Sequence, residues 1–118
     1  MLSERARRWL HDIIQACLLI ERWTAEAGGA EAMIADDKHR SAVERQLLLI
    51  SEAAIRLRNA HPDALDTIVP GVDWAGVRGM GNVIRHRYDD MDHAIVADVA
   101  ANKIMTLRLA CEKALGAA

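Results

Sequence analysis

The stretch VERQLLLISEAAIRL, residues 43–57, decides the fold class of this chain. Its apolar side chains recur every three or four residues, which is the spacing of one buried stripe on an α-helix. The stripe consists of Val43, Leu47, Ile50, Ala54 and Leu57. An aspartate at position 36 or 37 can cap the start of this helix, because a carboxylate accepts hydrogen bonds from unpaired backbone amides. The pattern predicts a helix over residues 36–60.

Helix breakers divide the chain on either side of this segment. A glycine pair at 28–29 ends an earlier apolar segment, and prolines at 62 and 70 bracket a short middle piece. An aspartate-rich run at 89–92 marks a third break, with Asp92 as the expected N-cap of the last helix. The main helices are predicted over residues 3–27, 36–60, 72–88 and 92–116, with a short fifth helical turn near 63–68. We expect an all-α fold, an antiparallel up-and-down bundle of four main helices.

Length and composition favour a single helical domain. The chain has 118 residues, which fit one domain spanning residues 1–118. Hydrophobic residues make up 52% and charged residues 27%, and the chain has no Phe and a single Tyr. A β-sandwich or barrel draws more heavily on aromatic and β-branched residues. The abundant residues here are good helix formers, namely Ala, Leu, Arg and Glu.

Charge and hydropathy limit the function classes that remain. The net charge of −2 argues against a strongly basic domain that coats nucleic acid, but it leaves room for a small basic site. No stretch approaches the roughly 20 apolar residues that a membrane span needs, and the first residues do not match a signal peptide. We expect a cytoplasmic protein that contacts no membrane, in which Cys17 and Cys111 are buried, reduced thiols.

The first predicted helix carries more apolar surface than one face requires. One stripe consists of Ala6, Leu10, Ile13, Cys17 and Ile20. The apolar residues beyond that stripe are Trp9, Ile14, Leu18, Leu19 and Trp23. Two explanations remain open. The second surface can be covered by another copy of the chain in a homodimer, which we favour, or the helix can be buried more deeply within one chain.

The residues that can carry chemistry concentrate in PGVDWAGVRGMGNVIRHRY, residues 70–88. Three glycines inside a helix cost about 1 kcal/mol each relative to Ala, so we expect a close backbone approach or a need for open space. One helix face carries Val77, Met80, Ile84 and Tyr88, and a second arc carries Arg78, Asn82, Arg85 and His86. Arginine binds phosphate oxygens in a fork, histidine transfers protons near neutral pH, and an amide orients a substrate. These groups suit a metal-free phosphodiester reaction; a solvated polar face is the other interpretation.

Several motifs carry a resemblance to a known family. They are AVER at 42–45, ISEAA at 50–54, VDW at 72–74, GMGN at 79–82 and HRY at 86–88. With these motifs the chain resembles the HepT-type toxins of the HEPN superfamily over essentially its whole length. The HRY segment is similar to the family's His-x-Tyr ending, which is the most specific element.

The resemblance implies a fold, an activity and partners. The fold would be a dimeric up-and-down helical bundle with the two motif helices facing each other, and the activity would be metal-independent RNA cleavage without a cofactor. His86 would be the general acid or base and Asn82 its polar neighbour. The partner would be a cognate MNT-type nucleotidyltransferase, the antitoxin of a type II toxin–antitoxin system, which can modify Tyr88 with adenylate.

The chain departs from the family pattern at one position. The family places an arginine four to six residues ahead of the histidine gap, and the corresponding slots here are Gly79, Met80 and Gly81. Because position 81 shares a helix face with positions 78 and 85, a long side chain from either can reach the space that Gly81 leaves empty. We expect Arg78 or Arg85 to supply the displaced guanidinium. The alternative is a non-catalytic dimer with a degenerate motif that binds a nucleotide, RNA or a partner protein.

The other titratable residues are expected to be structural. Glu21 is expected to be a solvated or dimer-rim charge. Glu52 is expected to be buried against an arginine, because an unpaired buried carboxylate is costly. The acidic run at 89–92 is expected to cap the last helix rather than bind a cation, so no metal site is predicted. The expected surface histidines are His11, His39 and His61.

Overall fold

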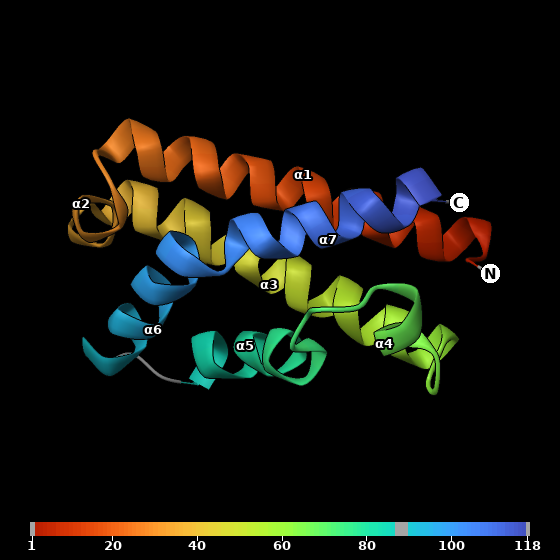
Figure 1. Cartoon of the computed structure of the whole chain (residues 1–118). Helices are drawn as coiled ribbons and strands as arrows, with labels where there is room; N and C mark the ends of the chain where they lie inside the picture. The colour runs from red at the N-terminus through yellow and green to blue at the C-terminus, as the bar shows by residue number, and fades with distance from the viewer. Residues whose placement is uncertain (1, 87–89, 118) are drawn as a thin grey trace.

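The computed structural model describes the backbone of residues 2–86 and 90–117, with their side chains except those of residues 86, 90–92 and 117. Every regular element in these ranges is an α-helix (Figure 1). The elements are α1 (Glu4–Ala27), α2 (Ala30–Ala35), α3 (Asp37–Ala60), α4 (Leu65–Ile68), α5 (Trp74–His86), α6 (Asp90–Asn102) and α7 (Ile104–Ala117). The all-α prediction is confirmed, and none of the described helices is long and apolar enough to cross a bilayer.

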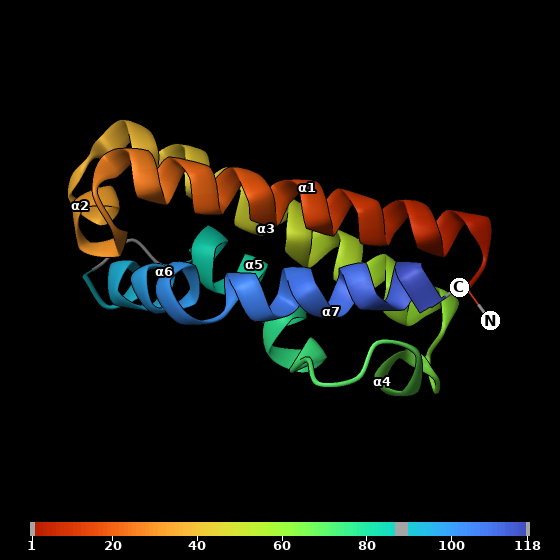
Figure 2. The ribbon, with the colours of Figure 1, turned by 45° about the horizontal axis from the view of Figure 1, so that its top comes forward.

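The long helices run up and down beside one another (Figures 1 and 2). α1 and α3 pack along most of their lengths in opposite directions, and α7 runs back along α1. α5 packs on α3 and reverses its direction. The expected bundle is therefore present, with α1, α3, α5 and the α6–α7 pair as its four main members.

The core consists of the stripes that the sequence pattern predicts. Val43, Leu47, Ile50, Ala54 and Leu57 of α3 have no exposed surface. The same is true of Ala6, Leu10, Ile13, Cys17 and Ile20 of α1. Because apolar surface removed from water contributes about 25 cal/mol per Å², these two facing stripes supply much of the stabilisation of the bundle.

The additional apolar surface of α1 is largely used within the chain. Ile14 is buried, and Trp9 and Trp23 are half-buried against the core. Leu18 remains 41% exposed. α1 is covered by α3 on one side and α7 on another, so its broad apolar surface requires no second copy. A homodimer stays a prediction, since this burial within the chain does not exclude a second copy on the exposed Leu18.

Capping residues set the ends of α1 and the start of α3. The Asp36 carboxylate accepts hydrogen bonds from the backbone amides of Lys38 and His39 at 2.9 and 3.1 Å, which confirms the predicted cap. Gly28 ends α1 in the left-handed conformation, with φ of 105°, and its N–H bonds to the Ala25 carbonyl at 3.1 Å. Glycine adopts this conformation without steric cost, so the chain can turn here.

The short helix α2 was not predicted. It follows the glycine pair directly, and the fully buried Met33 anchors it to the core. α2 packs against α1, α3 and α6. A six-residue helix is too short to show a helical period in the sequence, so its formation depends on tertiary packing.

The single helix predicted over residues 92–116 is two helices that meet at Lys103. The Lys103 amide bonds to the Val99 carbonyl and the Leu107 amide to the Lys103 carbonyl, at 3.0 and 3.1 Å, so hydrogen bonding continues across the bend. α6 packs against α2 while α7 packs against α1, and the two halves follow these different supports. The first of the two helices, α6, begins at Asp90, so Asp92 lies inside α6 and is not its N-cap.

Candidate active site

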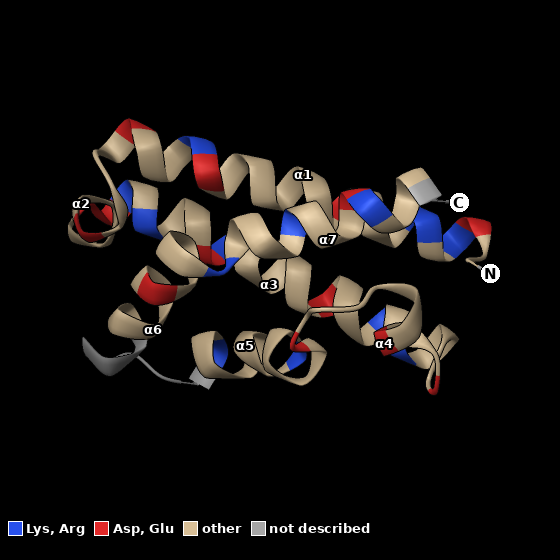
Figure 3. Cartoon of the chain, viewed as in Figure 1, with Lys and Arg blue, Asp and Glu red and all other residues tan. Residues whose placement is uncertain are grey.

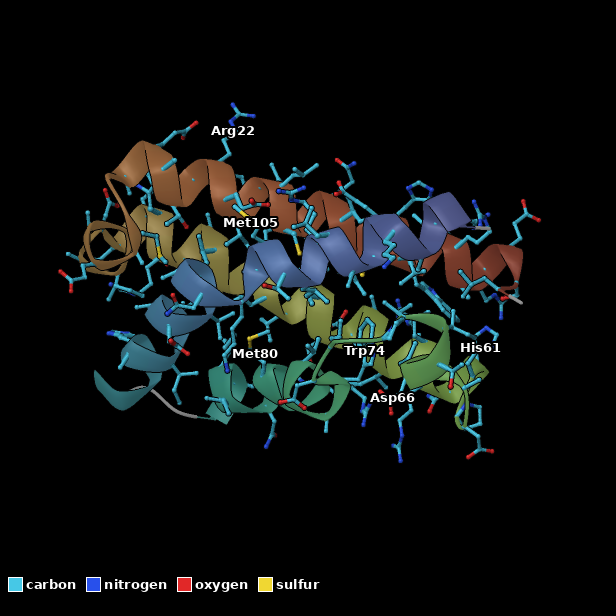
Figure 4. All side chains as sticks on the ribbon, viewed as in Figure 1. Arg22, His61, Asp66, Trp74, Met80 and Met105 are labelled. Atoms are coloured by element: carbon cyan, nitrogen blue, oxygen red, sulfur yellow. The ribbon has the colours of Figure 1, made fainter. Side chains whose placement is uncertain are left out.

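The start of α5 is held by two side chains. The Asp73 carboxylate accepts a hydrogen bond from the Gly76 amide at 3.1 Å and caps the helix. The buried Trp74 indole donates to the Val69 carbonyl at 3.1 Å and fixes the preceding loop; Figure 4 shows its side chain between α5 and α4. The helix that carries the candidate residues therefore begins at a capped end that is hydrogen-bonded to the preceding loop.

The glycines of α5 have different surroundings. A Cβ atom on Gly76 would meet the Asp73 carboxylate, which is the exposed end of the capping side chain. A Cβ on Gly81 would lie 2.6 Å from the Ser51 hydroxyl oxygen and 3.0 Å from its Cβ. A Cβ on Gly79 would meet nothing within 4 Å. The expected close approach is confirmed at position 81, where α3 lies against the glycine, whereas Gly76 faces only the Asp73 side chain and Gly79 faces open space.

Ser51 joins α5 to the core. It lies on the buried face of α3 and has no exposed surface. Its hydroxyl donates to the Arg78 carbonyl at 2.6 Å and accepts from the Gly81 amide at 3.2 Å. This residue was quoted in the sequence only as part of the ISEAA motif, because nothing local in the chain indicates a partner about 30 residues away.

Arg85 reaches the space that Gly81 leaves. Its terminal nitrogen Nη2 lies 3.1 Å from the position that a Cβ on Gly81 would occupy. Arg85 is exposed at the surface of α5, as is Asn82. The geometric expectation that a guanidinium from the next turn can lie over position 81 is met by Arg85.

Arg78 is placed differently from Arg85. The helical period places both on the same face of α5. They are seven positions apart, which is about 10 Å along a helix axis, and Figure 3 shows basic residues at separate places along α5. The half-buried Arg78 lines a cavity of about 260 Å³ together with Arg58 and Trp74. Asp63, Asp66 and Asp73 also line this cavity. The two arginines therefore cannot occupy one position, and Arg78 belongs to a neighbouring part of the surface.

The side chains of two candidate residues, His86 and Tyr88, lie outside the part of the chain that the structure describes. His86 is the last residue of α5, one turn after Asn82, and its side chain lies outside the described residues. Tyr88 and the aspartate at 89 lie outside the described residues altogether. Across the described side chains, no group of three or more His, Cys, Asp or Glu residues is arranged to hold a metal ion.

An apolar cavity lies on the other side of α5. It has a volume of about 520 Å³ and separates α5 from α6 and α7. Its apolar lining includes Val77 and Met80 from α5, Val99 from α6 and Leu107 from α7. Met80 is buried, and Figure 4 shows its side chain on the side of α5 that faces this space. The predicted apolar face of α5 is thus directed partly into this cavity rather than wholly into the core.

Two expectations about acidic residues were wrong. Glu21 forms a bidentate ion pair with Arg108, at 2.6 and 3.1 Å, and Arg108 also bonds to Glu112 at 3.0 Å. The Glu21 partner lies 87 residues away, beyond the reach of any local pattern. Glu52 is half-buried and forms no ion pair within the part of the chain that the structure describes.

The remaining titratable residues discussed in the sequence analysis, two cysteines and three histidines, lie outside α5. Burial raises the pKa of the Cys111 thiol to about 12 and that of Cys17 above its usual range, so neither forms a thiolate nucleophile. The expectation that both cysteines are buried is confirmed. His11 is exposed as predicted, whereas His39 and His61 are half-buried.

Comparison with known proteins identifies a family that this chain resembles over most of its length. The family model described as "Ribonuclease HepT-like" matches residues 13–114. The match covers most of the chain and includes the whole of α5 and Ser51. No solved structure matches the chain.

Proposed function

Since the chain belongs to the HepT-like ribonuclease family, we propose that it is a metal-independent endoribonuclease whose α5 surface binds and cleaves RNA. We further propose that it is the toxin of a type II toxin–antitoxin pair, neutralised by a nucleotidyltransferase-fold antitoxin. The proposed catalytic and binding residues are Arg78, Asn82, Arg85 and His86.

One observation carries the catalytic part of the proposal. Arg85 Nη2 lies 3.1 Å from the Cβ position of Gly81, one of the slots in which the family motif places its arginine. The guanidinium therefore lies beside the motif position although it originates one turn later. Arginine in this place supports phosphate binding by paired N–H donors.

The proposed reaction needs only a base, an acid and charge stabilisation. The 2′-hydroxyl oxygen attacks the adjacent phosphorus, its proton passes to a base, and the P–O5′ bond breaks as the leaving oxygen takes a proton. The products are a 2′,3′-cyclic phosphate and a 5′-hydroxyl. His86 transfers a proton in this step, and Arg85 stabilises the charge on the phosphate oxygens. Asn82, one turn before His86, orients the substrate.

Arg78 has a binding role in this scheme. It lies about 10 Å from Arg85 along α5 by helix geometry, so it contacts a flanking phosphate rather than the scissile one. The cavity that it shares with Arg58 is also lined by three aspartates, so the basic contribution beside the site comes from Arg78 itself. We therefore expect Arg78 to contribute to RNA affinity more than to the chemical step.

The partners follow from the same family membership. We propose a homodimer in which the two α5 helices face each other across the RNA cleft. The antitoxin is a nucleotidyltransferase that modifies Tyr88, which is the sole tyrosine of the chain. If so, mass spectrometry of the co-expressed pair finds adenylate at position 88 and nowhere else.

The direct test is cleavage of RNA by the purified protein in the presence of EDTA. We expect fragments that end in a 2′,3′-cyclic phosphate, and we expect His86→Ala to abolish them. Expression of the wild-type chain alone should arrest growth, and co-expression of the antitoxin should relieve the arrest. A protein that binds RNA but yields no fragments under these conditions would reject the ribonuclease.

The replacement of the motif arginine by Gly79, Met80 and Gly81 favours a second candidate function. It is a non-catalytic dimer that binds a nucleotide, RNA or a nucleotidyltransferase partner. It predicts tight complex formation without growth arrest, and His86→Ala should then change neither growth nor complex formation.

A further inference from the structure

We propose that Ser51 is a positioning residue of the ribonuclease site, because its two hydrogen bonds fix α5 on α3 and its side chain closes position 81 beside the Arg85 guanidinium. This inference rests on the proposed function for its catalytic consequence. Its structural part, the mutual dependence of Ser51 and Gly81, stands on contacts alone.

The Ser51 hydroxyl fixes how α5 sits on α3. One hydroxyl satisfies both the Arg78 carbonyl, at 2.6 Å, and the Gly81 amide, at 3.2 Å. These two backbone groups lie almost one turn apart, so the pair of bonds sets both the rotation of α5 and its position along its own axis. A rotation of α5 or a shift along its axis would break one of these bonds and leave a buried polar group unpaired, which lowers the stability of the fold.

Ser51 also excludes any side chain at position 81. A Cβ there would lie 2.6 Å from the Ser51 oxygen and 3.0 Å from the Ser51 Cβ. The serine has no exposed surface, and moving aside would break its two hydrogen bonds to α5. Close-packed interiors transmit such an overlap as a displacement of the helix. With Ser51 present, only glycine fits at position 81.

The same exclusion keeps one of the three motif slots, position 81, without a side chain beside the Arg85 guanidinium. Arg85 Nη2 lies 3.1 Å from the point that a Cβ on Gly81 would occupy, so Arg85 and Ser51 border the same small volume. An arginine at position 81 would displace both. The departure from the family motif is thus a coupled arrangement of three residues rather than the simple loss of one.

A matched pair of glycine variants tests the exclusion. Gly81→Ala should lower the melting temperature and reduce kcat for RNA cleavage on the order of a hundredfold, because small misplacements of catalytic groups have effects of that size. Gly79→Ala lies two residues away with nothing within 4 Å, so it should retain activity and raise the melting temperature. Equal behaviour of the two variants overturns the proposal.

A double-mutant cycle tests the coupling without reference to activity. Ser51→Gly removes the two atoms that crowd position 81, so Gly81→Ala should lower the melting temperature less in that background than in the wild type. Ser41→Gly is the control, since Ser41 lies on the exposed face of the same helix. Gly81→Ala should retain its full effect there. Additive melting temperatures for the Ser51 pair contradict the inference.

The kinetic signature separates positioning from simple destabilisation. At a temperature where the protein remains folded, Ser51→Ala should reduce kcat while leaving KM for RNA nearly unchanged, because the flanking phosphate contacts remain. Wild-type kcat for the folded variant overturns the positioning role even if the proposed ribonuclease is correct. If the wild-type chain cleaves no RNA, the proposed function fails, and the melting-temperature cycle alone decides whether Ser51 and Gly81 are coupled.

Discussion

Ser51 on α3 and Gly81 on α5 are in direct contact. The Ser51 hydroxyl oxygen accepts a hydrogen bond from the Gly81 amide nitrogen at 3.2 Å, and no side-chain atom fits between the two residues. This contact brings the face of α5 that carries Arg85 to a fixed position on the core. The glycine that interrupts the family motif is therefore also the residue that allows the motif helix to approach α3.

The Glu21–Arg108 ion pair should stabilise the packing of α7 on α1. Both side chains are mostly buried, with exposed fractions of 25% and 17%, and the pair is bidentate. Arg108→Ala leaves Glu21 without its partner and should lower the free energy of unfolding by about 1–2 kcal/mol. Urea unfolding measures this change.

An exposed ion pair provides the control. Arg22 and Glu26 form an i,i+4 pair on the surface of α1, with exposed fractions of 69% and 49%. Arg22→Ala should lower the free energy of unfolding by no more than about 0.5 kcal/mol; Figure 4 shows Arg22 extending away from the bundle. If Arg108→Ala lowers the free energy of unfolding no more than Arg22→Ala does, the Glu21–Arg108 pair does not stabilise the fold more than an exposed pair.

The cap at Asp36 should make part of the stability depend on pH. Hydrogen bonds from the His39 amide and side chain, with a further one from the Lys38 amide, hold the pKa of the Asp36 carboxyl below its usual range. Because the folded-state pKa is lowered, the stabilisation is complete above the ordinary aspartate pKa of about 3.9 and is lost as the pH falls through the folded value.

The expected observation is a melting-temperature difference between wild type and Asp36→Ala that is constant near neutral pH and shrinks in acid. Asp12→Ala is the control, since Asp12 is exposed on α1 and caps no helix. The melting temperature of Asp12→Ala should differ from that of the wild type by the same amount at each pH. A difference for Asp36→Ala that grows in acid would contradict the assigned cause.

The two cysteines should be inert in the folded protein. Burial raises the pKa of Cys111 to about 12 and that of Cys17 further, and neither thiol is exposed. Iodoacetamide at pH 8 should therefore modify neither residue on the time scale in which a free thiol reacts. Both should react fully in urea, as followed by intact mass. Rapid labelling of the native protein would show that α1 and α7 separate readily.

The core of the fold was predictable because its signal is local. The α3 stripe from Val43 to Leu57 follows one helical period, and the Asp36 cap depends on residues within three positions of it. Interactions between distant segments carry no such signal. Ser51 bonds to a residue 30 positions away, and Glu21 to one 87 positions away.

Two helical features were missed for the same physical reason. α2 forms because Met33 can be buried against three other helices, which six residues of sequence do not reveal. The bend at Lys103 contains neither Pro nor Gly, and its hydrogen bonds continue across it. In both cases tertiary packing decides the local geometry, so a single sequence predicts helix but not its interruption.

The candidate site was predictable in its residue types and only partly in its geometry. The helical period placed Arg78, Asn82 and Arg85 on one arc, but it left Arg78 and Arg85 as alternatives for the same role. The structure separates them, because Arg85 borders the Gly81 space while Arg78 lines a cavity with Arg58.

The most direct test compares single-turnover RNA cleavage by Arg85→Ala and Arg78→Ala, with Arg8→Ala as the control for loss of one exposed charge on the distant α1. Arg85→Ala should slow the chemical step about 10²–10³-fold, the usual effect of removing one donor to a developing charge. Arg78→Ala should weaken RNA binding with a nearly unchanged chemical step, and Arg8→Ala should match the wild type. Wild-type cleavage by Arg85→Ala would contradict the assignment of the motif guanidinium to Arg85, and with it the central claim.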